Sequence, residues 1–233
     1  MASVLWRLLT VAGGVMEVAV FGATGATGLE ACRLSVAAGH TVRAVRRQGN
    51  ELSLAASDSL RAVHADVVTG DGVAEAVAGA DAVLSVLGAP SYTRHPITVY
   101  STGTHAIINA LREAGHGKRF VVVSSGLTYP PPAGCGFIAA RIVLSFLLNV
   151  LGKTLYADMR RLEELVRSSD DIAWTIMRPG HLFNTESVSQ CRLNLNDPTQ
   201  RYTSRVDLAA AMVGEIDTTE HVRQAVSRTT TRR

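Results

Sequence analysis

Lysine is nearly absent from this chain. Lys118 and Lys153 are its only lysines, so almost all of the 23 basic residues are arginines. The basic residues are offset by 20 acidic residues and form no basic stripe along the sequence. Because nucleic-acid binding requires clustered cations that neutralise a phosphate backbone, we expect no nucleic-acid partner.

Cysteine is also scarce, with three residues at widely separated positions. Cys32, Cys135 and Cys191 are odd in number, and no pair has CxxC spacing. Neither a disulfide framework nor a cysteine metal site is therefore predicted, and we expect no metal. Three reduced thiols are typical of a cytoplasmic protein.

Long apolar runs are missing as well. Residues 4–15 contain Arg7 and have no cleavage-like region, and residues 137–151 contain Arg141 and Asn149. A helix that crosses a bilayer needs about 20 mostly apolar residues, so neither run is predicted to span a membrane or to be a signal peptide. We expect no membrane partner. The second run is predicted to be a helix that belongs to the core, covers a substrate pocket or forms an oligomer contact.

From Met16 onward, apolar β-rich runs alternate with amphipathic helical stretches. This alternation is typical of a doubly wound parallel sheet, so we predict a single α/β domain of the Rossmann type over residues 16–226. Its C-terminal region is short and is expected to form a small substrate pocket. Residues 1–15 are predicted to be an extension that need not belong to the native fold, and residues 227–233 a disordered tail.

The expected elements follow from apolar periodicity and from the positions of glycine and proline. Strands are expected at 18–22, 40–45, 63–65, 82–87, 120–124 and 174–177. Helices are expected at 28–38, 52–56, 73–77, 100–114, 137–151, 154–168 and 206–216. Irregular loops are expected at 129–136, which contains three consecutive prolines, and at 183–205.

The most informative motif is GATGATG at residues 22–28, between the first predicted strand and the first predicted helix. Its three glycines permit a tight turn and close approach of backbone to a diphosphate, while free N–H groups at the helix start attract the anion. This order of strand, turn and helix predicts a nicotinamide dinucleotide site. The predicted diphosphate-binding residues are Gly22, Thr24, Gly25, Ala26, Thr27 and Gly28.

Arginine replaces the expected acidic residue at the end of the second predicted strand. A protein that prefers NAD usually offers a carboxylate there to the ribose hydroxyl, whereas this chain has Arg43, Arg46 and Arg47. Guanidinium groups pair bidentately with phosphate, so Arg46 and Arg47 favour the 2′-phosphate of NADP, and NAD is the less favoured cofactor. The alternative is a solvated basic strand end.

These motifs, together with Asp66-Val67, Leu87-Gly88, Ser124-Ser125 and WTIMRPG at 174–180, resemble those of atypical short-chain dehydrogenases/reductases. The chain is most similar to the NAD(P)H-binding group that includes biliverdin-IXβ/flavin reductases and NmrA-like proteins. The resemblance covers nearly everything after Met16.

The resemblance implies further cofactor contacts. Asp66 and Val67 would contact the adenine, Leu87 and Gly88 would line the cofactor, and Ser124 would lie near the nicotinamide. Residues 179–182, with Pro179 and His181, would pass along its other side. Simpler alternatives exist, because Asp66 could cap the following helix, Ser124 could bond backbone at a strand end, and His181 could be structural.

The resemblance also implies a place for the catalytic Tyr-x-x-x-Lys pair of short-chain dehydrogenases. Here the segment contains Tyr156 and Arg160, so arginine replaces the lysine that lowers the tyrosine pKa. We predict Ser124, Tyr156 and Arg160 as catalytic residues, with Asp158 as a further polar group near the nicotinamide. The alternative is an amphipathic helix surface on which Arg160 pairs with Glu164.

The predicted function is an NADPH-dependent reductase that transfers hydride to an apolar or aromatic small-molecule acceptor. A flavin, a quinone or a carbonyl compound would fit, since a flavin can take its proton from solvent. The alternative is an NADP-binding redox sensor of the NmrA-like type, without turnover. An epimerase-like enzyme is disfavoured by the short C-terminal region. We expect a monomer or a homodimer.

Overall fold

The computed structural model of this protein describes residues 14–89, 96–115, 119–128, 153–189, 193–195, 202–228 and 230. Several predicted features lie outside these ranges. They are most of the N-terminal extension, the proline-rich loop at 129–136, the apolar helix at 137–151, Cys135 and Cys191.

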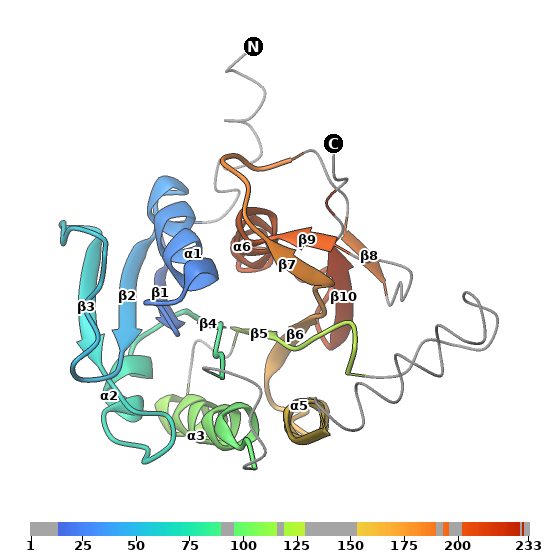
Figure 1. Cartoon of the computed structure of the whole chain (residues 1–233). Coiled ribbons are helices and arrows are strands. Elements are labelled where there is room, and N and C mark those ends of the chain that lie inside the picture. The colour runs from blue at the N-terminus through green and yellow to red at the C-terminus, as the bar shows by residue number, and fades with distance from the viewer. Residues whose placement is uncertain are drawn as a thin grey trace.

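A single eight-stranded sheet forms the centre of the described chain (Figure 1). Seven strands are parallel, and the last pairs antiparallel with its neighbour. In spatial order they are β3 (Leu60–His64), β2 (Thr41–Arg46), β1 (Glu17–Phe21), β4 (Ala82–Ser85), β5 (Arg119–Val123), β6 (Ala173–Met177), β10 (Gln224–Arg228) and β8 (Leu193–Leu195). This architecture confirms the predicted doubly wound α/β fold.

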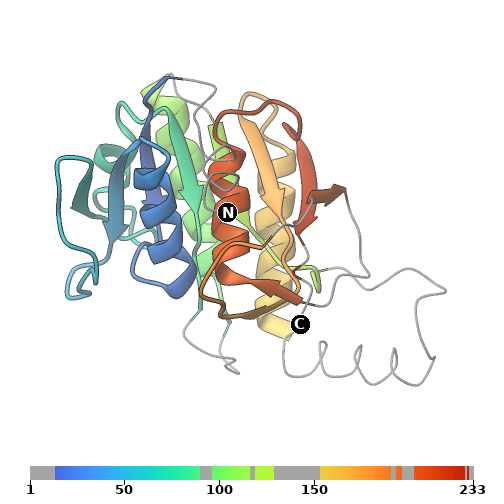
Figure 2. The same cartoon turned by 90° about the horizontal axis from the view of Figure 1, so that it is seen from above.

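Helices cover both faces of this sheet (Figures 1 and 2). On one face lie α1 (Ala26–Ala37) and α6 (Arg205–Gly214), and on the other lie α2 (Val73–Val77), α3 (Val99–Ala114) and α5 (Lys153–Arg167). A second, two-stranded sheet of β7 (His181–Phe183) and β9 (Tyr202–Ser204) lies close to the start of α6.

Two apolar layers result from the alternation of side chains along each strand. In β1, Val18 and Val20 pack with the α1 and α6 layer, whereas Ala19 and Phe21 pack with the α2, α3 and α5 layer. Because successive side chains of a strand point to opposite faces, a strand covered on both sides must be apolar throughout. This explains why the strands of this chain read as continuous apolar runs.

The strand order reverses direction between β1 and β4. The chain runs outward from β1 through β2 to β3, then returns to place β4 on the other side of β1. In open α/β sheets, ligands bind outside the carboxyl ends of the strands at such a switch point. The fold therefore places the candidate site above the ends of β1 and β4.

Three predictions about elements are wrong. Residues 52–56 form an irregular segment with a bend and no helix, and the supposedly loop-rich segment 183–205 contains β8 and β9. The predicted tail at 227–233 is also incorrect at its start, since β10 extends to Arg228 and Thr230 is buried. These short strands were missed because they depend on pairing with β6, β7 or β10, which are distant in sequence.

Candidate functional site

The turn between β1 and α1 admits only glycine at two positions. Gly22 has φ of +81°, and a Cβ there would lie 2.4 Å from the carbonyl oxygen of Val86. A Cβ on Gly28 would lie 2.1 Å from the carbonyl oxygen of Gly22. These close approaches press the turn against the end of β4 and press the start of α1 against the turn.

The N-terminus of α1 carries no side-chain cap. Its N-cap residue is Gly25, no side chain accepts a hydrogen bond from the first turn, and that turn contains no acidic residue. Unpaired N–H groups and the helix dipole together give a helix start a partial positive charge. The arrangement suits an anion held by backbone amides at residues 26–28.

Two cavities flank this turn. One, of about 380 Å³, lies on the β2 side, and the other, of about 410 Å³, extends toward β5, β6 and α5. Both are lined by Gly25 and by residues 86–88, so they adjoin along the end of β4. An elongated ligand could therefore occupy both cavities and pass over the start of α1.

Arginine and amide groups line the β2-side cavity. Arg46, Arg47 and Asn50 are among its lining residues, and none of its described lining residues is acidic. One terminal nitrogen of Arg46 donates to the Asn50 carbonyl, whereas its Nε is buried without a partner among the described residues. A rotation of Arg46 toward a ligand oxygen would thus break no Nε hydrogen bond. The predicted residues Gly22, Thr24 and Val67 line this cavity too.

Arg43 on β2 and Asp66 after β3 stabilise local structure. Arg43 is buried, pairs with Glu17 at 2.5 Å and donates to the Ala76 carbonyl near the end of α2. The hydrogen bond from Arg43 lowers the pKa of Glu17 below its ordinary value. Asp66 accepts the N–H of Val68 at 2.8 Å and does not line either cavity. Arg43 and Asp66 therefore make structural contacts, and the adenine contact of Asp66 stays a prediction.

A buried carboxylate network underlies the larger cavity. Ser124, at the end of β5, lines this cavity and donates its hydroxyl proton to Glu163 at 2.8 Å. Glu163 is fully buried and also accepts from Nε of Arg178 at 2.9 Å. Neither Glu163 nor Arg178 was predicted as a site residue. The available signal was spacing, because Glu163 follows Tyr156 by two helical turns on α5.

The predicted tyrosine and arginine pair does not meet at the cavity. Tyr156 is buried on α5 and lines the cavity, but Arg160 donates to the Thr128 carbonyl at 3.1 Å and is not a lining residue. Asp158 is buried and accepts the N–H groups of Tyr100 and Ser101, so it caps α3. The structure therefore joins Tyr156 with Ser124 but separates Arg160 and Asp158 from them.

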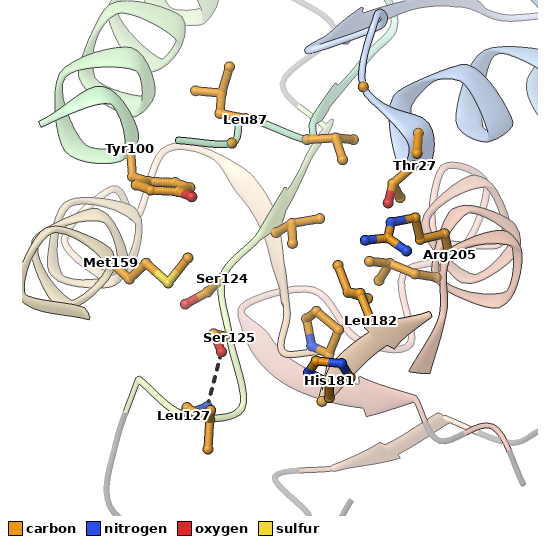
Figure 3. Close-up of a pocket in the computed structure, with 18 of the residues that line it drawn as sticks. Thr27, Leu87, Tyr100, Ser124, Ser125, Leu127, Met159, His181, Leu182 and Arg205 are labelled. Carbon is orange, nitrogen blue, oxygen red and sulfur yellow. Dashed lines mark hydrogen bonds between the residues drawn. The ribbon is translucent and has the colours of Figure 1, made fainter. Parts of the chain in front are cut away.

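The walls of the larger cavity are mainly apolar (Figure 3). The Tyr100 hydroxyl accepts the N–H of Ala89 at 3.0 Å, and the guanidinium of Arg205 projects into the cavity. None of the described lining residues is acidic. Sequence reasoning had missed Tyr100, Met159 and Arg205. The predicted lining residues that the structure places here are Gly25, Ala26, Thr27, Gly28, Leu87, Gly88, Ser124, Tyr156, Pro179 and His181.

Other kinds of site find little support in the described residues. No cluster of three or more His, Cys, Asp or Glu side chains there is arranged to hold a metal ion. None of the described helices combines the length and apolarity that a membrane crossing requires. Burial raises the pKa of the Cys32 thiol to about 12, so this cysteine is inert at neutral pH.

Comparison with protein families gives one match over most of the chain. The sequence model of a family described as NAD(P)H-binding matches residues 22–219. The match begins at Gly22, the first glycine of the turn, and extends past α6.

Solved structures with the same fold span nearly the whole chain. The oxidoreductase ylbE from Lactococcus lactis is 20% identical, with a TM-score of 0.75 over 93% of this chain and 91% of that one. A short-chain dehydrogenase/reductase from Veillonella parvula DSM 2008, in complex with NADP, is 14% identical, with a TM-score of 0.73 over 93% and 95%. SP1627 from Streptococcus pneumoniae TIGR4, proposed to be an NADH-flavin reductase, is 20% identical, with a TM-score of 0.68 over 93% and 100%. Identities this low establish a shared fold alone.

Proposed function

This chain belongs to the NAD(P)H-binding family, and we propose that its two adjoining cavities hold one extended dinucleotide across the carboxyl edge of the sheet. The adenosine half occupies the β2-side cavity, beside Arg46 and Val67. The diphosphate lies over the uncapped start of α1, and the nicotinamide half enters the larger cavity beside Ser124. The observation that carries this proposal is the glycine-only turn with its uncapped helix between the two cavities.

We further propose that NADP is preferred over NAD. A free ribose diol is usually held by a carboxylate at the end of the second strand, and no acidic residue lines that cavity within the described chain. Arg46 and Arg47 line it instead, and Arg46 has a buried Nε without a partner. A 2′-phosphate matches two guanidinium groups in charge and in geometry.

The activity we propose is reduction of a flat, apolar acceptor. The bound nicotinamide supplies the hydride. The chain holds the acceptor between apolar walls, which exclude water and include Leu127, Leu155 and Met159. A flavin or a quinone fits this description, because most of the described walls are apolar.

The hydrogen bonds around Ser124 restrict how protons can move. Ser124 donates its only hydroxyl proton to Glu163, and its oxygen also bonds the Thr128 hydroxyl at 3.0 Å, so Ser124 has no proton to give to a ligand in the cavity. Tyr156 is therefore the side chain we assign as proton donor, without help from Arg160, which bonds to Thr128. An acceptor that is protonated by solvent would not depend on Tyr156.

A second candidate function is a redox sensor that binds NADP without turnover. It is favoured by one observation, that Arg160, at the position of the family's lysine, donates to the Thr128 carbonyl and does not line the cavity. In that case the larger cavity would serve to distinguish the oxidised from the reduced nicotinamide.

Calorimetry and steady-state kinetics separate these functions. Titration with NADPH and NADH tests the shared premise, and failure of both to bind would refute the proposal. Oxidation of NADPH is then followed with riboflavin, FMN and a set of quinones. Sustained turnover supports the reductase, whereas tight binding without consumption supports the sensor. A Tyr156→Phe variant should lose turnover with carbonyl acceptors and keep it with flavins.

A further inference from the structure

The cations that face the two cavities are unevenly placed. Within the described lining residues, the arginines are Arg46 and Arg47 on the β2 side and Arg205 in the larger cavity. The glycine-rich turn at 22–28 contains no basic residue. Any positive side chain near the start of α1 must therefore come from another element of the fold.

The fold brings Arg205 to that place. Arg205 is the first residue of α6, which packs beside α1 on the same face of the sheet (Figures 1 and 2). Each of these helices runs opposite to the parallel strands, so both begin at the carboxyl edge. In Figure 3 the guanidinium of Arg205 points into the cavity on the side of Thr27, which belongs to the first turn of α1.

The partners of Arg205 differ from those of three arginines that are buried or largely buried. Arg43, Arg119 and Arg178 each pair with a carboxylate, from Glu17, Glu215 and Glu163 respectively. Arg205 forms no ion pair with any described carboxylate. A terminal nitrogen donates to the Asn184 carboxamide at 2.8 Å, which orients the group without neutralising it. Its charge therefore remains available to a ligand.

We propose that Arg205 is a cofactor-binding residue that holds the diphosphate together with the backbone amides at the start of α1. This inference rests on the proposed function. A diphosphate carries about two negative charges, whereas a helix N-terminus supplies only about half a positive charge. One guanidinium brings the site close to neutrality, just as Arg46 and Arg47 do for a 2′-phosphate. Asn184 acts as a positioning residue.

The experiment measures binding of ligands that contain different parts of the cofactor. ADP-ribose carries the diphosphate without nicotinamide, and 2′-AMP carries the adenosine 2′-phosphate without the diphosphate. Arg205→Gln should weaken ADP-ribose and NADP by about tenfold, the loss expected for a charge-assisted hydrogen bond, and leave 2′-AMP unchanged. The affinity of Arg205→Lys for ADP-ribose and NADP should lie between those of the parent protein and Arg205→Gln. Asn184→Ala, which keeps the cation, should weaken ADP-ribose by a smaller factor.

A matched control is Arg33→Gln, which removes an exposed arginine of α1 that pairs with Glu30 and should leave all affinities unchanged. Circular dichroism and urea midpoints confirm that each variant is folded. Equal ADP-ribose affinity in Arg205→Gln and the parent protein would overturn the proposal. The proposal would also be overturned if Arg205→Gln raised only the KM of FMN and not that of riboflavin. That result would mean that Arg205 binds the phosphate of an acceptor. If the parent protein binds neither ADP-ribose nor NADP, the proposed function itself fails.

Discussion

Two groups of arginine side chains contrast in this protein. Those in the first group pair with a buried or partly buried carboxylate, as Arg178 pairs with Glu163, and they hold strands and helices together. Those in the second group, including Arg46 and Arg205, face a cavity and have no described carboxylate partner. A buried guanidinium without a counter-ion is costly, so an arginine left without a carboxylate at a cavity is a candidate for anion binding.

Replacing Arg46 tests the cofactor preference. Arg46→Ala should weaken NADP by on the order of 1–3 kcal/mol more than NAD, because only NADP has the 2′-phosphate that a guanidinium would pair with. Calorimetric titration with both dinucleotides measures the difference. Equal losses for the two cofactors would contradict the assignment, and Arg33→Ala serves as the control for net charge.

Replacing Glu163 tests the buried network under the larger cavity. Glu163→Gln keeps an oxygen that can accept from Ser124 but removes the charge that neutralises Arg178. Breaking a buried ion pair from one side typically costs about 3 kcal/mol or more, so the urea midpoint should fall substantially. Glu30→Gln, which breaks the exposed pair with Arg33, should not change it measurably. An unaltered midpoint in Glu163→Gln would show that the pair is dispensable for stability.

At the scale of elements, the β1–α1 turn is the feature with the least freedom. Its conformation depends on backbone contacts alone, since Gly22 and Gly28 have no side chains. Within the same turn, Gly25 has φ of −76°, a value open to any residue, and a Cβ there would meet nothing closer than 3.4 Å. The three glycines therefore differ in what they contribute.

Alanine substitutions should separate these contributions. Gly28→Ala places a methyl group 2.1 Å from the Gly22 carbonyl oxygen, so the backbone must shift. It should destabilise the fold by about 2 kcal/mol or more and abolish dinucleotide binding. Gly25→Ala should nearly preserve the urea midpoint while weakening dinucleotide binding, because Gly25 lines both cavities. Equal stability of the two variants would contradict the geometry of the turn.

At the scale of the whole molecule, Asp207 connects segments that are far apart in sequence. This buried carboxylate on α6 accepts hydrogen bonds from Ser189 and from Thr230, beyond β10. Burial alone would raise its pKa, but hydrogen bonds from Thr230, Ser189 and Ser204 outweigh burial, so the pKa lies below the ordinary 3.8. The C-terminal segment is thereby fastened to the same helix that carries Arg205.

The lowered pKa predicts how stability depends on pH. The ionised form of Asp207 stabilises the fold, so its contribution is complete above the ordinary pKa of 3.8 and is lost as the pH falls through the lower folded-state value. The difference in unfolding free energy between the parent protein and Asp207→Asn should therefore shrink below about pH 4. Urea titrations from pH 7 to pH 3 measure it. A difference that stays constant with pH would contradict the prediction, and Asp58→Asn, at an exposed position, is the control.

Local patterns were sufficient to predict six strands of the sheet, most helices and the glycine-rich turn between β1 and α1. Apolar strands between amphipathic helices allow few arrangements other than a doubly wound sheet, and three glycines between β1 and α1 allow few turns. The position of Arg46 and Arg47 beside that turn was likewise predictable, because Arg46 ends β2 and Arg47 directly follows it. Each of these inferences depends on residues close together in sequence.

What the sequence alone determined is therefore the nucleotide-binding framework. Only the tertiary structure decided that Glu163 and Arg178 hold Ser124, that Arg160 bonds away from the cavity, and that α6 brings Arg205 beside the start of α1. It also decided the pairing of β10 with β6, which places residues 227 and 228 in a strand where the sequence predicted a tail. The physical reason is that these contacts join segments far apart in the chain. Packing, and not the local sequence pattern, selects the partner of a charged side chain or of a short strand.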